Sequence, residues 1–93
     1  MKIEVLYFAD IKDIIGKDNE IYELNNSSLK DFVNLLLHKY PLIKDLIWEE
    51  YKDNIKRSVK IAINDEIVFS EKLLNIELSE GDRLAFILPI SGG

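Results

Sequence analysis

Hydrophobic and polar residues alternate along several short stretches of the chain, which is the pattern of β-strands with two different faces. Turn residues at Asn64-Asp65 and Glu80-Gly81-Asp82 separate the later stretches, and the first of these turns favours a hairpin. The predicted strands cover residues 2–8, 20–24, 59–63, 67–69 and 83–88.

A helical pattern occupies residues 29–40, where apolar side chains recur at three- and four-residue spacing and form one core-facing stripe. Ser28 precedes it as a capping residue, with Asp31 near the positive end of the helix. Pro41 ends the pattern because its ring and missing N–H are incompatible with a helix interior. We therefore expect the main helix of the domain here.

Two further segments have weaker helical character. Residues 9–15 carry apolar positions at helical spacing and stop at Gly16, which can adopt the left-handed conformation that closes a helix. Residues 42–51 carry a second stripe, which is followed by a polar stretch at 52–57. We predict a short helical turn in the first segment and a weak helix in the second.

The predicted order of elements is strand, strand, helix, strand, short strand and strand. This order defines an α+β fold, in which a mixed sheet packs on one main helix. The connection through the helix would make the first and last strands parallel neighbours in the middle of the sheet. With 93 residues and no linker or repeat, the chain is expected to form a single domain over residues 1–93.

Composition narrows the possible functions. The net charge of -5, without a long basic run, disfavours nucleic acid as a partner and suits a basic protein surface. The absence of cysteine and the single histidine, His38, argue against disulfides, zinc clusters, thiol nucleophiles and Ser-His or Cys-His catalysis, and we expect no metal site. The sequence shows neither a membrane span nor a signal peptide, so we expect a cytoplasmic protein.

The most informative residues are the last two, Gly92 and Gly93. At an average glycine usage of about 7%, a chance pair has a prior of roughly 1 in 200, so a working C-terminus is favoured over a frayed end. Because glycine has no Cβ, such a tail can extend through a narrow channel and expose its terminal carboxylate. We expect a flexible tail over residues 89–93, with Gly93 as the reacting group.

The whole C-terminal stretch, residues 79–93, resembles the ending of the MoaD-type small subunit of molybdopterin synthase, in which Gly-Asp, a hydrophobic strand, proline and Gly-Gly follow one another. Residues 5–9 and 14–16 are similar to the opening strand of that family, its Phe-Ala step and its short helix ending in glycine. Residues 61–65 are similar to its third strand and turn.

This resemblance implies a ubiquitin-like β-grasp sulfur carrier that binds no cofactor of its own. An E1-like adenylyltransferase of the MoeB type would use ATP to adenylate Gly93, which would then become a thiocarboxylate. The sulfur would pass to precursor pterin, cyclic pyranopterin monophosphate, in the large MoaE-type subunit, for molybdenum cofactor biosynthesis. The implied assembly is a heterotetramer with that subunit, in which the carrier donates sulfur and the partner supplies the catalytic side chains.

Two features depart from the family pattern. Leu88-Pro89 replaces the paired prolines that commonly precede the tail, and residues 41–57 are longer than in a minimal member. Related functions remain open: a ubiquitin-related modifier for tRNA thiolation or protein conjugation, and a ThiS-type carrier for thiazole synthesis. A passive β-grasp interaction module would not need a free Gly93.

The strand pattern also leaves apolar residues on the sheet face opposite the helix, and such an exposed patch suggests partner docking. Either the segment at 42–51 covering this face, or a strand register shifted by one residue, would remove the patch. Trp48 is expected to pack in the core, and His38 to face solvent. The predicted docking residues are Leu6, Phe8, Ala62, Ala85, Ile87, Pro89, Ile90 and Ser91.

Overall fold

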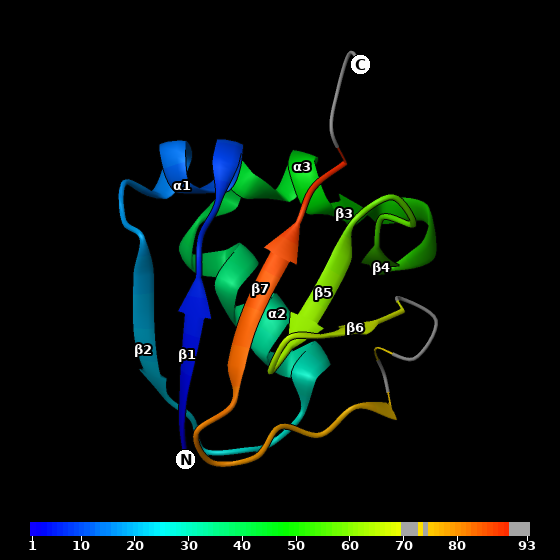
Figure 1. The fold of residues 1–93 in the computed structure, drawn as a ribbon. Helices are drawn as coiled ribbons and strands as arrows, with labels where there is room; N and C mark the ends of the chain where they lie inside the picture. The colour runs from blue at the N-terminus through cyan, green and yellow to red at the C-terminus, as the bar shows by residue number, and fades with distance from the viewer. Residues whose placement is uncertain (70–72, 74, 90–93) are drawn as a thin grey trace.

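A computed structural model describes residues 1–69, 73 and 75–89 of the chain. Its main feature is a five-stranded sheet with the order β2-β1-β7-β5-β6 (Figure 1). The strands are β1 (Lys2–Leu6), β2 (Asn19–Glu23), β5 (Lys60–Ile63), β6 (Glu66–Val68) and β7 (Arg83–Ile87).

The two central strands, β1 and β7, are parallel, and every other pairing in this sheet is antiparallel. This arrangement confirms the predicted mixed sheet with its first and last strands side by side. The β5–β6 hairpin turns through Asn64 and Asp65, which both have positive φ, at 52° and 72°. Asn and Asp tolerate this conformation better than most residues, which explains their position in the turn.

Helix α2 (Leu29–Lys39) packs behind the sheet, as Figure 1 shows. Ser28 caps it, since its Oγ accepts a hydrogen bond of 3.1 Å from the Asp31 N–H. Apolar side chains of the helix and of the inner sheet face form one core, so the predicted helix and its apolar stripe are confirmed. The largest core side chains include Ile3, Tyr7, Leu29, Phe32, Leu36, Leu84 and Phe86.

Helix α1 (Ala9–Ile15) follows β1 directly and confirms the predicted short helix. Gly16 closes it with φ of 81° and donates its N–H to the Lys12 carbonyl oxygen. Ala9 also has a positive φ, of 51°, which is uncommon for a residue with a Cβ. This local turn sets the direction in which the chain leaves β1 and enters the helix.

The middle of the chain differs from the prediction. The weak helix expected at 42–51 is instead the 3-10 turn η1 (Pro41–Ile43), the short helix α3 (Lys44–Ile47), the strand β3 (Trp48–Glu49) and the 3-10 turn η2 (Glu50–Lys52). Within the stretch predicted to be polar and irregular, β4 (Asn54–Ile55) pairs with β3 and buries Ile55. Two-residue strands are too short to show periodicity, so the pattern could not reveal them.

This middle segment packs at one end of the sheet, and none of the helices formed by residues 1–69, 73 and 75–89 crosses the sheet face opposite α2 (Figure 1). Ile43, Ile47 and Trp48 are buried in the same core as α2. The alternative in which residues 42–51 cover the open sheet face is therefore wrong. Among the described residues, no helix is both long enough and apolar enough to cross a membrane.

Candidate functional site

The sheet face opposite α2 carries one continuous row of apolar residues, and the strand register produces it. Leu6 lies opposite Ala85 in the parallel pair, and Ala85 lies opposite Ala62 in the antiparallel pair. Ala62 in turn lies opposite Ile67 on the edge strand β6. Because neighbouring strands place paired residues on the same face, these four side chains form a shallow apolar strip across four strands.

A second row lies next to this strip, near the C-terminal end of β7. Ile87 lies opposite Lys60, whose Nζ stands 5.6 Å from the centre of the Phe69 ring. Phe8, at the end of β1, is 51% exposed, and Ile87 is 42% exposed. We call the apolar residues of both rows the open face: Leu6, Phe8, Ala62, Ile67, Phe69, Ala85 and Ile87.

The open face contains all five sheet residues that the sequence predicted for docking, and the predicted register is confirmed, since Ile3 and Val5 point into the core. The sequence missed Ile67 and Phe69 as members of this face. Their period-two alternation with Val68 would have identified them. Of the predicted tail residues, Pro89 lies next to the open face, whereas Ile90, Ser91, Gly92 and Gly93 lie outside the described residues.

The direction of β7 relates the open face to the C-terminus. Since β7 is central and parallel to β1, the chain leaves the sheet at the end where Phe8 lies. Leu88 and Pro89 continue from this point toward the diglycine. A protein that covers the open face is thereby close to the root of the tail.

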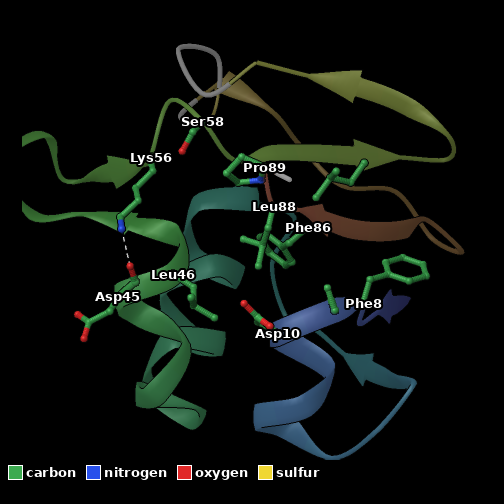
Figure 2. A pocket seen from close by; sticks show the side chains of 11 residues that line it. Phe8, Asp10, Asp45, Leu46, Lys56, Ser58, Phe86, Leu88 and Pro89 are labelled. Carbon is green, nitrogen blue, oxygen red and sulfur yellow. Dashed lines mark hydrogen bonds between the residues drawn. The ribbon is translucent and has the colours of Figure 1, made fainter. Parts of the chain in front are cut away.

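A groove opens beside this root, between the start of α1, helix α3 and the end of β7 (Figure 2). Its volume is about 750 Å³. Phe86, Leu88 and Leu46 supply apolar lining, and Asp10 points into the groove (Figure 2). The groove is contiguous with the open face, because its lining includes both Phe8 and Ile87.

A polar cluster on the other side of the sheet was not foreseen from the sequence. Glu20 accepts hydrogen bonds of 2.7 Å from the hydroxyls of Tyr7, Tyr22 and Tyr40 through a single oxygen, Oε1. Its second oxygen, Oε2, accepts from Lys17 at 3.0 Å and from Lys39 at 3.1 Å. No sequence motif predicts this cluster, because its members come from β1, β2, the end of α2 and the α1–β2 loop.

The hydrogen bonding and charge of the Glu20 cluster indicate a structural role. Burial alone would raise the pKa of Glu20, but hydrogen bonds from the three tyrosines and Lys17 outweigh it and hold that pKa far below its usual value. Burial raises the pKa of Tyr22 to about 12. The hydrogen bond with Tyr7 opposes this increase, and the interaction with Glu20 adds to it. Glu20 therefore stays ionised at neutral pH and joins the end of α2 to the edge strand β2, without a proton to exchange.

The described residues contain no cluster of histidine, cysteine and acidic side chains that could hold a metal ion. His38 is exposed and Trp48 is buried, as the sequence predicted. Asp82 accepts from the Asn64 side-chain amide at 2.8 Å and from the Ser79 N–H at 2.7 Å, which accounts for it as a turn residue. His38, Trp48 and Asp82 are thus explained without a functional role. The candidate functional site therefore consists of the open face, the tail and the groove.

The mixed sheet, its covering helix and the C-terminal strand at its centre define the ubiquitin-like β-grasp class, here with an exposed apolar face beside the end of β7. Within this class, the chain belongs to the ThiS family, which matches residues 5–93.

Two relatives share the full length of the chain. The molybdopterin synthase sulfur carrier subunit of Chlamydomonas reinhardtii is 28% identical over 94 residues, which cover 100% of both chains. The structure of a protein–protein complex of subunits 1 and 2 of the molybdopterin-converting factor from Helicobacter pylori contains a chain that is 27% identical. It matches with a TM-score of 0.62, and the match covers 100% of both chains.

A third similar protein has a different name. The small archaeal modifier protein 1 of Methanosarcina acetivorans, determined in solution, is 25% identical with a TM-score of 0.75. The match covers 99% of this chain and 96% of that one. Proteins similar to this chain are thus named both as a sulfur carrier subunit and as a modifier.

Proposed function

We propose that this protein is the sulfur-carrier subunit of a molybdopterin synthase and that the carboxylate of Gly93 carries the sulfur. The observation that supports this most directly is the central strand β7, which leads from an exposed apolar face toward a Gly-Gly terminus. Full-length similarity to a molybdopterin synthase sulfur carrier subunit supports the same function.

The chemistry begins with activation of the terminal carboxylate, which is a poor electrophile. In the active site of an E1-like adenylyltransferase, a Gly93 oxygen attacks the α-phosphate of ATP and pyrophosphate leaves. A sulfide equivalent from a sulfur donor then attacks the carbonyl carbon and displaces AMP, which leaves a thiocarboxylate. ATP is thus a substrate of the partner, and the carrier itself requires only its main-chain terminus.

In the second half of the cycle, the thiocarboxylate sulfur attacks an oxygen-bearing carbon of the pterin precursor, cyclic pyranopterin monophosphate, in the large subunit. A carbon–sulfur bond forms while the carbon–oxygen bond at that carbon breaks, and the oxygen leaves on the phosphate or, after protonation, as water. Water then cleaves the resulting acyl–sulfur bond, which leaves the sulfur on the pterin and restores the Gly93 carboxylate. Two carriers together supply the two sulfur atoms of a dithiolene. The resemblance to molybdopterin synthase implies that the catalytic side chains belong to the large subunit.

The carrier contributes a docking surface and a C-terminal tail that extends into the partner's active site. The open face supplies apolar area that a partner can cover, and apolar burial is worth about 25 cal/mol per Å². Pro89 restrains the backbone where the tail leaves the sheet, while Gly92 and Gly93 present no side chain to a narrow channel. Docking through the open face places the tail root at the partner's surface and leaves the terminus free to enter its active site.

Two partners follow from this scheme: a large MoaE-type subunit, in a heterotetramer, and a MoeB-type adenylyltransferase. The complex of subunits 1 and 2 from Helicobacter pylori supports the first of them. The net charge of -5 suits both, because complementary basic surfaces accelerate association.

The test is the intact mass of the protein after co-expression with an E1-like adenylyltransferase and a sulfur source. We expect one oxygen atom to be replaced by sulfur, and peptide fragmentation to place the sulfur at Gly93. The matched control is a variant with one alanine added after Gly93, which should stay unmodified although its fold is intact. A modified control, or an unmodified wild-type chain that still supports pterin thiolation, would contradict the proposal.

A second candidate function is that of a protein modifier, which the similarity to the small archaeal modifier protein 1 supports. In that case the activated Gly93 carbonyl would be attacked by a lysine amine of another protein. Mass spectrometry of cell lysates should then show isopeptides that join Gly93 to lysine side chains. Abundant adducts, with pterin synthesis unaffected by deletion of the gene, would favour the modifier over the dedicated carrier.

A further inference from the structure

The groove beside the tail root combines an apolar lining with one carboxylate. Leu46 of α3 and Leu88 after β7 contribute apolar walls, while Asp10 at the start of α1 points between them (Figure 2). No hydrogen bond or ion pair joins the Asp10 carboxylate to any other described residue. Lys56 is the cationic residue in the groove lining, but its Nζ donates a hydrogen bond to the main-chain oxygen of Asp45 (Figure 2).

This arrangement restricts what can cover the groove. A partner on the open face meets Phe8 and Ile87, which also line the groove, so it meets the groove as well. If the partner covered Asp10 with apolar surface alone, it would remove the carboxylate from water without compensation. Burying an unpaired charge in this way costs on the order of several kcal/mol of binding free energy. A partner that covers Asp10 therefore has to supply compensating hydrogen-bond donors, and a cationic donor also compensates the charge.

The shape and lining of the groove indicate which kind of cation this is. Lysine and arginine carry an aliphatic stem that packs against apolar walls and a charged end that pairs with a carboxylate. The apolar walls at Leu46, Phe86 and Leu88 suit the stem, and Asp10 suits the charged end. A small inorganic cation would leave the apolar walls uncovered.

We propose that the groove receives a lysine or arginine side chain of the large synthase subunit, which pairs with Asp10 while a neighbouring apolar residue of that subunit covers Phe8 and Ile87. This inference rests on the proposed function, because it assumes that the large subunit docks on the open face. It adds a charged contact at the tail root to an interface that is otherwise apolar. Such a contact orients the carrier, because an apolar face alone tolerates several docking angles.

The experiment measures binding of the full chain to its purified large subunit by isothermal titration calorimetry. Asp10→Asn removes the charge and keeps the side-chain size, and we expect it to weaken binding about tenfold or more. Asp10→Glu should restore most of the affinity. Asp13→Asn is the matched control, because Asp13 is exposed on the same helix outside the groove, and it should bind as wild type does.

A third variant, Ile87→Asp, separates failure of this inference from failure of the proposed function. If Ile87→Asp abolishes binding while Asp10→Asn and Asp13→Asn both bind as wild type does, the groove contact is overturned and the docking face stands. If Ile87→Asp also binds normally, docking through the open face is itself wrong. If Asp10→Asn weakens binding only to the adenylyltransferase, the assignment to the large subunit is wrong. Thermal unfolding of each variant verifies that the fold is retained.

Discussion

Ala62 of β5 lies directly opposite Ala85 of β7, and these two small residues occupy the middle of the open face. Leu6 and Ile67 continue the same row on either side. The small pair makes the centre of the face shallow, so a flat or slightly convex partner surface can approach the sheet closely. This pairing is the basis of the first prediction.

Ala62→Glu places a charge at the centre of the open face. Since Ala62 is only partly buried, the free energy of unfolding should change by about 1 kcal/mol or less. Partner binding should weaken strongly, because the docked partner would cover the introduced charge and leave it unpaired. Chemical denaturation and a reconstituted sulfur-transfer assay measure the two effects. Asn34→Glu, at an exposed position of α2 away from the open face, adds the same charge and serves as the control. Undiminished sulfur transfer by Ala62→Glu would argue against docking through this face.

Phe86→Ala is expected to lower the stability of the fold. Phe86 is fully buried on the opposite face of β7, so its truncation should lower the free energy of unfolding by about 3–5 kcal/mol. Urea denaturation at neutral pH measures this loss. A loss below about 1 kcal/mol would mean that the core does not form as described, since even single buried methylene groups contribute about that much.

The hydrogen bonds and ion pairs of Glu20 are expected to stabilise the fold in a way that is lost at acidic pH. Because the folded-state pKa of Glu20 is lowered from 4.5, this contribution is fully present above pH 4.5 and is lost as the pH falls toward the folded-state pKa. Glu20→Gln should lower stability at pH 7 by about 1–3 kcal/mol and flatten its fall at acidic pH. The measurement is urea denaturation at pH 7 and pH 3.

The control for Glu20 is Glu23→Gln on the same strand. The Glu23 carboxylate is exposed and, within the part of the chain that the structure describes, forms an ion pair only with the N-terminal amine, at 3.3 Å. Its effect at pH 7 should stay below about 1 kcal/mol, as for other exposed ion pairs. Equal effects of the two substitutions would show that the three tyrosine hydroxyls do not depend on the Glu20 charge.

Gly81→Ala tests backbone conformation in the turn before β7. Gly81 has φ of 84°, and no atom lies within 4 Å of the position that a Cβ would take. The expected loss of about 1 kcal/mol would therefore come from backbone strain alone. Thermal and urea unfolding measure it. Gly16→Ala, with φ of 81° and equally open space, should give a similar loss. A neutral Gly81→Ala would mean that the turn relaxes to negative φ.

The sequence predicted the elements whose physical causes are local. Strand alternation at residues 2–8 and 83–88 indicated β1 and β7, and the cap at Ser28 with the break at Pro41 bounded α2. It failed between residues 42 and 57, where turns and two-residue strands have no period to detect. Ile55 is buried there and pairs with Trp48. Its neighbours in the sequence are polar, so the hydrophobic pattern did not indicate that Ile55 is buried.

The same division applies to the candidate site. The sequence by itself determined which residues alternate onto one sheet face, and Gly92-Gly93 in a chain without cysteine led to the proposal that the terminal carboxylate carries the sulfur. Only the tertiary structure decided that the described residues leave this face uncovered, that Asp10 points into a groove beside the tail root, and that Glu20 accepts hydrogen bonds from three tyrosines. These relationships join residues far apart in the chain, and only the packing of α1, α2, α3 and β7 in space brings them together.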